Sequence, residues 1–143
     1  VKGFFSDTMP KHKGGQGGIG PIAILRMDGD MFASTSDILY ALYESLEVGG
    51  FVIIDDWFIH QCRMAVLLFR QKQGISDTIH NIDGQAAYWR KGEDVVVNHD
   101  EYLFMREQGF SMYEEGLGKG GAVKDYWKFA HEMEIPQEAS WFK

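Results

Sequence analysis

The sequence predicts an α/β domain in which a parallel βαβ unit is followed by an antiparallel hairpin. Two short apolar runs, residues 22–27 and 51–54, contain several β-branched side chains, as buried strands do. One helix-length segment separates them, and a crossover of this kind makes the two strands parallel and usually right-handed. Further along, Asp83-Gly84 lies between two more apolar runs, a pattern typical of a tight hairpin.

The βαβ unit can be divided into its elements. The first strand is expected over Ile22–Met27 and to be fully buried. Ser34-Thr35-Ser36-Asp37 offers side-chain oxygens that can cap the first amides of a helix, so a helix is expected to begin there. Apolar residues then recur at helical spacing as far as Leu46, and Gly49-Gly50 is expected to end the helix. The second buried strand covers Phe51–Ile54.

The second half of the fold is predicted from the same kinds of pattern. A helix is expected from about Gln61 to Gln73, closed by Gly74, and strands over Thr78–Ile82 and Ala86–Trp89 form the hairpin. The residues expected to face inward from this helix are Ala65, Val66, Leu68 and Phe69. Beyond Lys91 the pattern weakens, although residues 95–97 could form a strand. A later helix face could be formed by Val123, Tyr126, Trp127, Ala130 and Met133.

Residues 11–20 contain five glycines and are expected to form a flexible linker. A glycine loop that cradles phosphate should follow a strand and open a helix. This segment instead follows Lys11-His12-Lys13 and leads into Pro21 and a strand. The order of elements therefore favours a linker over a nucleotide-binding loop.

Composition narrows the class of protein. A chain of 143 residues with 45% hydrophobic and 14% aromatic residues suits one folded domain. No run of 18 apolar residues and no charged-then-apolar leader is present, so neither a membrane span nor a signal peptide is indicated. Cys62 has no partner for an internal disulfide, which suits the reducing cytoplasm. The expected location is therefore cytoplasmic, without a membrane partner.

The net charge of −7 argues against nucleic acid as a partner, because binding to phosphates requires a basic surface. The charge is unevenly distributed. Residues 1–91 hold ten acidic and nine basic side chains, whereas residues 92–143 hold eleven acidic and five basic ones. Residues 92–143 are therefore expected to be an acidic C-terminal extension of unknown role.

Two carboxylate pairs, Asp28-Gly29-Asp30 and Asp55-Asp56, follow the two predicted strands. The carboxyl ends of parallel strands open on the same edge of a sheet, where ligands bind in open α/β folds. Crowded carboxylates repel one another unless a cation lies among them, and oxygen ligands suit Mg²⁺, with Mn²⁺ or Ca²⁺ as alternatives. The pairs therefore predict a metal site, although aspartates can also cap helices or close turns.

Asp-x-Asp motifs occur in several metal-dependent enzymes. A phosphatase of the haloacid dehalogenase type would place its Asp-Asp pair much farther downstream, with a lysine between the motifs. Here one short helix without lysine separates the two pairs. A phosphatase is therefore disfavoured, and a metal-dependent glycosyltransferase remains an alternative.

Several motifs in matching order and spacing resemble the macrocin O-methyltransferase family. The matching segments are residues 2–10, 22–35, 49–57, 62–66, 69–70 and 82–91. The resemblance covers residues 1–91 and implies the C-terminal half of a class I, Rossmann-like methyltransferase domain. The glycine-rich turn that binds S-adenosylmethionine and the acidic residue after the next strand would then lie upstream of Val1, so no cofactor-binding residue is assigned here.

The resemblance implies a Mg²⁺- and S-adenosylmethionine-dependent enzyme that methylates a sugar hydroxyl of a glycosylated secondary metabolite, as in antibiotic biosynthesis. Carried over by position, Asp28, Asp55 and Asp56 would hold the metal and Asp30 would be the general base. Trp57 replaces a tyrosine common in the family. An alternative is a non-catalytic remnant of the fold that binds metal or oligomerises, since an exposed sheet edge would favour a homo-oligomer.

Two further side chains, His60 and Cys62, follow the second acidic pair. His60 could face a substrate, but a surface position at the start of a helix is favoured. Cys62 is expected to be a small buried residue rather than a nucleophile, because no histidine–acid partnership accompanies it.

Overall fold

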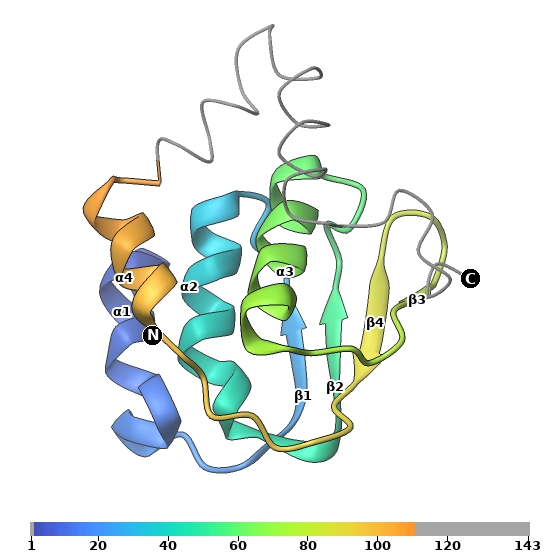
Figure 1. Cartoon of the computed structure of the whole chain (residues 1–143), viewed down its shortest axis with the longest axis horizontal. Helices are drawn as coiled ribbons and strands as arrows, with labels where there is room; N and C mark the ends of the chain where they lie inside the picture. The colour runs from blue at the N-terminus through green and yellow to red at the C-terminus, as the bar shows by residue number, and fades with distance from the viewer. Residues whose placement is uncertain (1, 111–143) are drawn as a thin grey trace, which may run out of the picture.

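The computed structural model describes residues 2–110, which form one helical layer against a four-stranded sheet (Figure 1). In chain order the elements are α1 (Phe5–Thr8), the 3₁₀ helix η1 (Met9–Gly18), β1 (Ile22–Met27), α2 (Phe32–Leu42), the 3₁₀ turn η2 (Tyr43–Ser45), β2 (Leu46–Ile54), α3 (His60–Gln73), β3 (His80–Asn81), β4 (Ala87–Arg90) and α4 (Asp100–Glu107).

The sheet has the strand order β1-β2-β4-β3. Strands β1 and β2 are parallel, with Met27 opposite Ile54, and α2 connects them as the crossover. Strand β4 runs antiparallel to both β2 and β3, and Ala87 lies opposite Ile54. The predicted βαβ unit and the antiparallel hairpin are therefore both confirmed.

The core lies between the sheet and the layer formed by α2 and α3, which pack side by side on one face (Figure 1). Leu25, Met27, Val52 and Ile54 point into it from the two parallel strands. On the opposite face, Ile24 is 59% exposed and Phe51 is 39% exposed. The expectation of a fully buried first strand and a buried second strand was therefore wrong, because the helices among residues 2–110 cover one face of the sheet only (Figure 1).

The start of α2 differs from the expectation. The helix begins at Phe32, two residues before the predicted cap, and its N-cap residue is Met31. The Ser34 hydroxyl donates to the carbonyl oxygens of Gly29 and Met31 instead of accepting from helix amides. A serine inside the first turn can bond back to preceding carbonyls, so a run of small polar residues does not locate the cap by itself.

The predicted end of this helix was also wrong. Helix α2 ends at Leu42, and β2 already begins at Leu46, so Gly49-Gly50 lies inside the strand. Gly49 has φ +87°, and the pairing of β1 with β2 changes register nearby. At Gly50 an added Cβ would lie 2.8 Å from the Ala23 carbonyl oxygen. These glycines therefore allow strand irregularity and close backbone approach, not helix termination.

The second helix and the turn agree with the sequence pattern. Helix α3 covers His60–Gln73 and ends at Gly74, whose φ of +68° is left-handed. Its four predicted inward-facing residues are buried. In the hairpin turn, the Asp83 carboxylate accepts hydrogen bonds from the amides of Gln85 and Ala86, both at 2.9 Å. Strand β3 is shorter than the predicted strand over Thr78–Ile82, and β4 has the predicted length but begins one residue later, at Ala87.

Two segments outside the βαβ unit contribute more structure than expected. The segment predicted as a flexible linker forms most of η1, which begins with a proline in its first turn and packs against α2. Residues 95–97 are not a strand, although Val97 is buried. Helix α4 also joins the core, through Tyr102 and Met105. The helix face expected over 123–133 lies outside the described residues.

Within residues 2–110, no helix combines the length and the apolar character needed to cross a membrane.

Candidate metal centre

Both carboxylate pairs lie at the carboxyl edge of the two parallel strands. Asp28 directly follows β1, and Asp55-Asp56 directly follows β2. The Asp55 amide donates to the Met27 carbonyl oxygen at 3.0 Å, which extends the parallel pairing up to the acidic residues. The two pairs therefore lie at the same edge of the sheet, as parallel strands require, although 27 positions separate Asp28 from Asp55.

Three carboxylates meet at this edge: Asp28, Asp30 and Asp56 each offer an oxygen, and these oxygens lie within 4.8 Å of one another. Asp56 is only 9% exposed, whereas the other two are exposed. The Asp30 amide donates to Asp56 Oδ2 at 3.2 Å. Asp30 has φ +49°, a left-handed conformation that aspartate tolerates better than most residues. The turn after Gly29 thus brings the Asp30 backbone amide to the Asp56 carboxylate.

The electrostatics of the cluster favour a cation. The charge of Asp56 is the main cause that raises the pKa of Asp30; its hydrogen bond to Asp56, partial desolvation and the charge of Asp28 add to it. Like charges held this close oppose one another's ionisation, and a cation between them removes that penalty. An all-carboxylate set of oxygen donors fits Mg²⁺ better than a soft transition metal. The residues present therefore fit a magnesium ion.

Asp55 lies apart from this cluster and pairs with Arg26. Arg26 Nη2 is 2.5 Å and Nε is 3.0 Å from Asp55 Oδ2, and Nε is 3.3 Å from Oδ1. The Arg26 side chain is 68% exposed and that of Asp55 is 25% exposed. Of the predicted ligands, the structure brings Asp28 and Asp56 together, adds Asp30, and leaves Asp55 with Arg26. The assigned roles of these four residues stay predictions.

The sequence favours Arg26 as a support for the acidic cluster or the fold rather than as a chemical group, but it did not identify Asp55 as the partner of Arg26. The alternation of side chains along a strand could have indicated it, because Arg26 lies opposite Ile53, two positions before Asp55, so the two share a face of the sheet. The close approach of the Gly29 turn to α2 was also missed. A Cβ on Gly29 would lie 3.1 Å from Thr35 Oγ1, so a side chain there would crowd this fully buried threonine.

The two side chains weighed beside the cluster lie as the favoured interpretations require. His60 is exposed at the first residue of α3, with Nδ1 3.1 Å from Arg63 Nη2. Cys62 is 1% exposed, and burial raises the pKa of its thiol to about 11. A thiol held in its neutral form is a poor nucleophile, so Cys62 is a packing residue.

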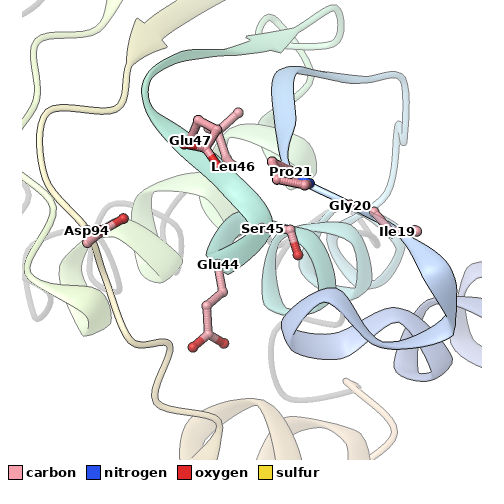
Figure 2. A pocket seen from close by; sticks show the side chains of 8 residues that line it. All are labelled: Ile19, Gly20, Pro21, Glu44, Ser45, Leu46, Glu47 and Asp94. Carbon is pink, nitrogen blue, oxygen red and sulfur yellow. The ribbon is translucent and has the colours of Figure 1, made fainter.

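A hollow of about 360 Å³ lies at the other end of the strands, where β1 and β2 begin. Figure 2 shows the side chains that line it, including Glu44, Glu47 and Asp94. Next to it, the buried Lys91 ammonium lies 2.6 Å from the Leu46 carbonyl oxygen and 3.5 Å from Asp94 Oδ1. This hollow is separated from the aspartate cluster by the length of the strands, so it is not part of the metal centre.

Comparison with known proteins identifies the family to which this sequence is similar. Residues 1–91 match the family model described as "Macrocin-O-methyltransferase (TylF)". The chain is 47% identical over 91 residues to the mycinamicin III 3''-O-methyltransferase of Micromonospora griseorubida. It is 41% identical over 92 residues to the demethyldecarbamoylnovobiocin O-methyltransferase of Streptomyces niveus. These matches cover 64% of this chain, but 34% and 33% of the two relatives. The chain thus spans about a third of their length.

Solved structures agree with the fold. The O-methyltransferase NovP matches with a TM-score of 0.60 at 39% identity, over 65% of this chain and 37% of that one. The TDP-rhamnose 3'-O-methyltransferase CalS11 of calicheamicin biosynthesis matches with a TM-score of 0.52 at 23% identity, over 65% of this chain and 41% of that one, and supports the fold alone. The parallel pair with its antiparallel strands is therefore part of a Rossmann-like methyltransferase fold, and the chain belongs to the macrocin O-methyltransferase family.

Proposed function

We propose that this chain carries the acceptor side of a Mg²⁺- and S-adenosylmethionine-dependent O-methyltransferase. The substrate would be a sugar hydroxyl of a glycosylated secondary metabolite, in a pathway of antibiotic biosynthesis. Membership of the family and the names of its relatives support the methyl transfer. The observation that carries the proposal is the cluster of Asp28, Asp30 and Asp56 at the carboxyl edge of the sheet.

The residues at this edge would have two roles, metal binding and proton abstraction. Asp28, Asp55 and Asp56 would hold Mg²⁺, which when bound acidifies a coordinated hydroxyl and orients it. Asp30 would accept the hydroxyl proton as the oxygen attacks the methyl group in line. The position of Asp30 supports this role, because its exposed carboxylate offers an oxygen within 4.8 Å of oxygens of Asp28 and Asp56.

A metal titration tests the site. Calorimetry with Mg²⁺ should show binding to the native chain and a loss of at least about tenfold in affinity for Asp28→Asn and for Asp56→Asn, since each removes a charged ligand from a small set. Glu47→Gln is the matched control, because Glu47 is an exposed carboxylate near the start of β2, far from the cluster. Unchanged affinity in both aspartate variants would remove the metal site.

Methyl transfer is tested separately. S-adenosylmethionine binding would be measured by calorimetry on this chain and on a version extended upstream, and binding by neither would count heavily against a methyltransferase. If the extended version is active, Asp30→Asn should lower its kcat by at least about a hundredfold, the usual contribution of general base catalysis. A near-native rate for Asp30→Asn would exclude Asp30 as the base.

A second candidate function is a non-catalytic, oligomerising form of the fold. The observation that favours it is the outer edge of β1, which has no neighbouring strand among residues 2–110, next to the exposed Ile24 and Phe51. Free strand edges and apolar sheet faces promote association. Sedimentation equilibrium would show a concentration-dependent dimer that Ile24→Lys weakens. A monomer throughout the concentration range would exclude this candidate.

A further inference from the structure

Arg26 is a cation that lies beside the acidic cluster without entering it. Its guanidinium contacts both oxygens of Asp55, and its shortest contact is the 2.5 Å between Nη2 and Asp55 Oδ2. Arg26 therefore binds one carboxylate of this edge with two of its guanidinium nitrogens.

The backbone leaves Asp55 close to the cluster. Asp55 precedes Asp56 directly, and its amide is bonded to the Met27 carbonyl oxygen, so its backbone lies beside the residues that carry the Asp28 and Asp56 carboxylates. The Arg26 side chain is 68% exposed, and an exposed ion pair of this kind contributes little to stability. A divalent cation carries twice the charge of a guanidinium and contacts several carboxylates at once. The bond between Arg26 and Asp55 is therefore replaceable.

We propose that Arg26 and a divalent cation compete for Asp55. Arg26 holds this carboxylate while the cation is absent, and binding of the cation transfers Asp55 to the site formed by Asp28 and Asp56 and releases Arg26 to solvent. The inference rests on the metal site proposed above and gives Arg26 a positioning role, since it acts through Asp55.

A double-mutant cycle of Mg²⁺ affinities tests the competition. Arg26→Gln should bind Mg²⁺ about three- to fivefold more tightly than the native chain, because the competitor is gone. In the Asp55→Asn background the same change should alter affinity by no more than about twofold. Arg90→Gln is the matched control: Arg90 is also an exposed arginine, on β4, and is bonded to the Gly49 carbonyl oxygen at 2.9 Å. It should leave the affinity within about twofold of native.

A second measurement needs no destabilising variant. The Nε–H resonance of Arg26, identified by its absence in Arg26→Lys, should be protected from exchange in the metal-free chain because Nε donates to Asp55. Saturation with Mg²⁺ should move this resonance and abolish its protection. A merely structural arginine would keep both its position and its protection.

The outcomes separate this inference from the proposed function. Native Mg²⁺ binding with no gain in Arg26→Gln overturns the competition and leaves the metal site standing. A gain that persists in the Asp55→Asn background also overturns it, because it would show only the removal of a nearby positive charge. Binding by neither the native chain nor Arg26→Gln overturns both proposals. A gain that depends on Asp55, together with the loss of Nε–H protection, supports the competition.

Discussion

Replacement of Tyr102 by phenylalanine tests the buried contact that attaches α4 to α2. The Tyr102 hydroxyl donates to Asp37 Oδ1 at 2.5 Å and accepts from Arg106 Nη1 at 3.0 Å. Asp37 is 3% exposed, and Arg106 Nη1 lies 3.6 Å from its Oδ1. The substitution removes one hydrogen bond to a buried charged group but keeps the aromatic ring, which stacks on Tyr40.

A hydrogen bond to a charged group contributes about 1.5–3 kcal/mol, so we expect the free energy of unfolding to fall by about 2 kcal/mol. For a chain of this size that corresponds to a fall in Tm of about 6–8 °C. Urea unfolding followed by circular dichroism should show a lower midpoint with an unchanged m-value. In the Asp37→Asn background the cost of Tyr102→Phe should be smaller, because the buried partner is then neutral.

The same variant should depend on pH in a defined direction. Burial raises the pKa of Asp37, so this residue contributes stability that is present below the pKa of the unfolded chain and is lost as the pH rises through the folded value. Tyr102 lowers that folded pKa by donating to the ionised carboxylate. The deficit of Tyr102→Phe should therefore be largest near about pH 7.5 and shrink toward about pH 4.5. A deficit below about 0.5 kcal/mol, or one that grows on acidification, would refute the reasoning.

Three further predictions concern packing, the thiol and the hairpin. Gly50→Ala should lower the free energy of unfolding by about 2 kcal/mol, because the added Cβ would lie 2.8 and 2.9 Å from two backbone carbonyl oxygens. Gly20→Ala is the control and should change the free energy of unfolding little, because the space around its Cβ is open. Equal effects of the two variants in urea unfolding would contradict the prediction. The Cys62 thiol should resist iodoacetamide in the native chain and react once the chain is unfolded, because burial raises its pKa to about 11. Mass spectrometry measures the labelling, and rapid labelling of the native chain would exclude the packing role. Asp83→Ala should destabilise the hairpin at neutral pH, because backbone amides lower the pKa of Asp83. The difference should shrink as the pH falls through that lowered pKa, and a difference that stays constant on acidification in unfolding experiments would mean another cause.

The sequence by itself determined the order of the main elements and the edge at which the aspartates lie. Helical spacing and a left-handed Gly74 define α3, and Asp83-Gly84 defines the hairpin turn. These signals are local, so neighbouring residues are enough to show them. Asp28 and Asp55 could be placed on one edge because any right-handed crossover brings the carboxyl ends of parallel strands together.

Only the tertiary structure decided which carboxylates meet. Asp30 joins Asp28 and Asp56 through a left-handed turn, and Asp55 pairs with Arg26 across the two strands. The direction of each side chain depends on strand register and on one backbone dihedral, and neither leaves a periodic pattern in the sequence. The same holds for Gly49-Gly50, which lies within β2 because of what packs against it. Within residues 2–110 the helices cover one face of the sheet, and this too depends on packing, because an apolar run does not show whether one or both faces of its strand are covered.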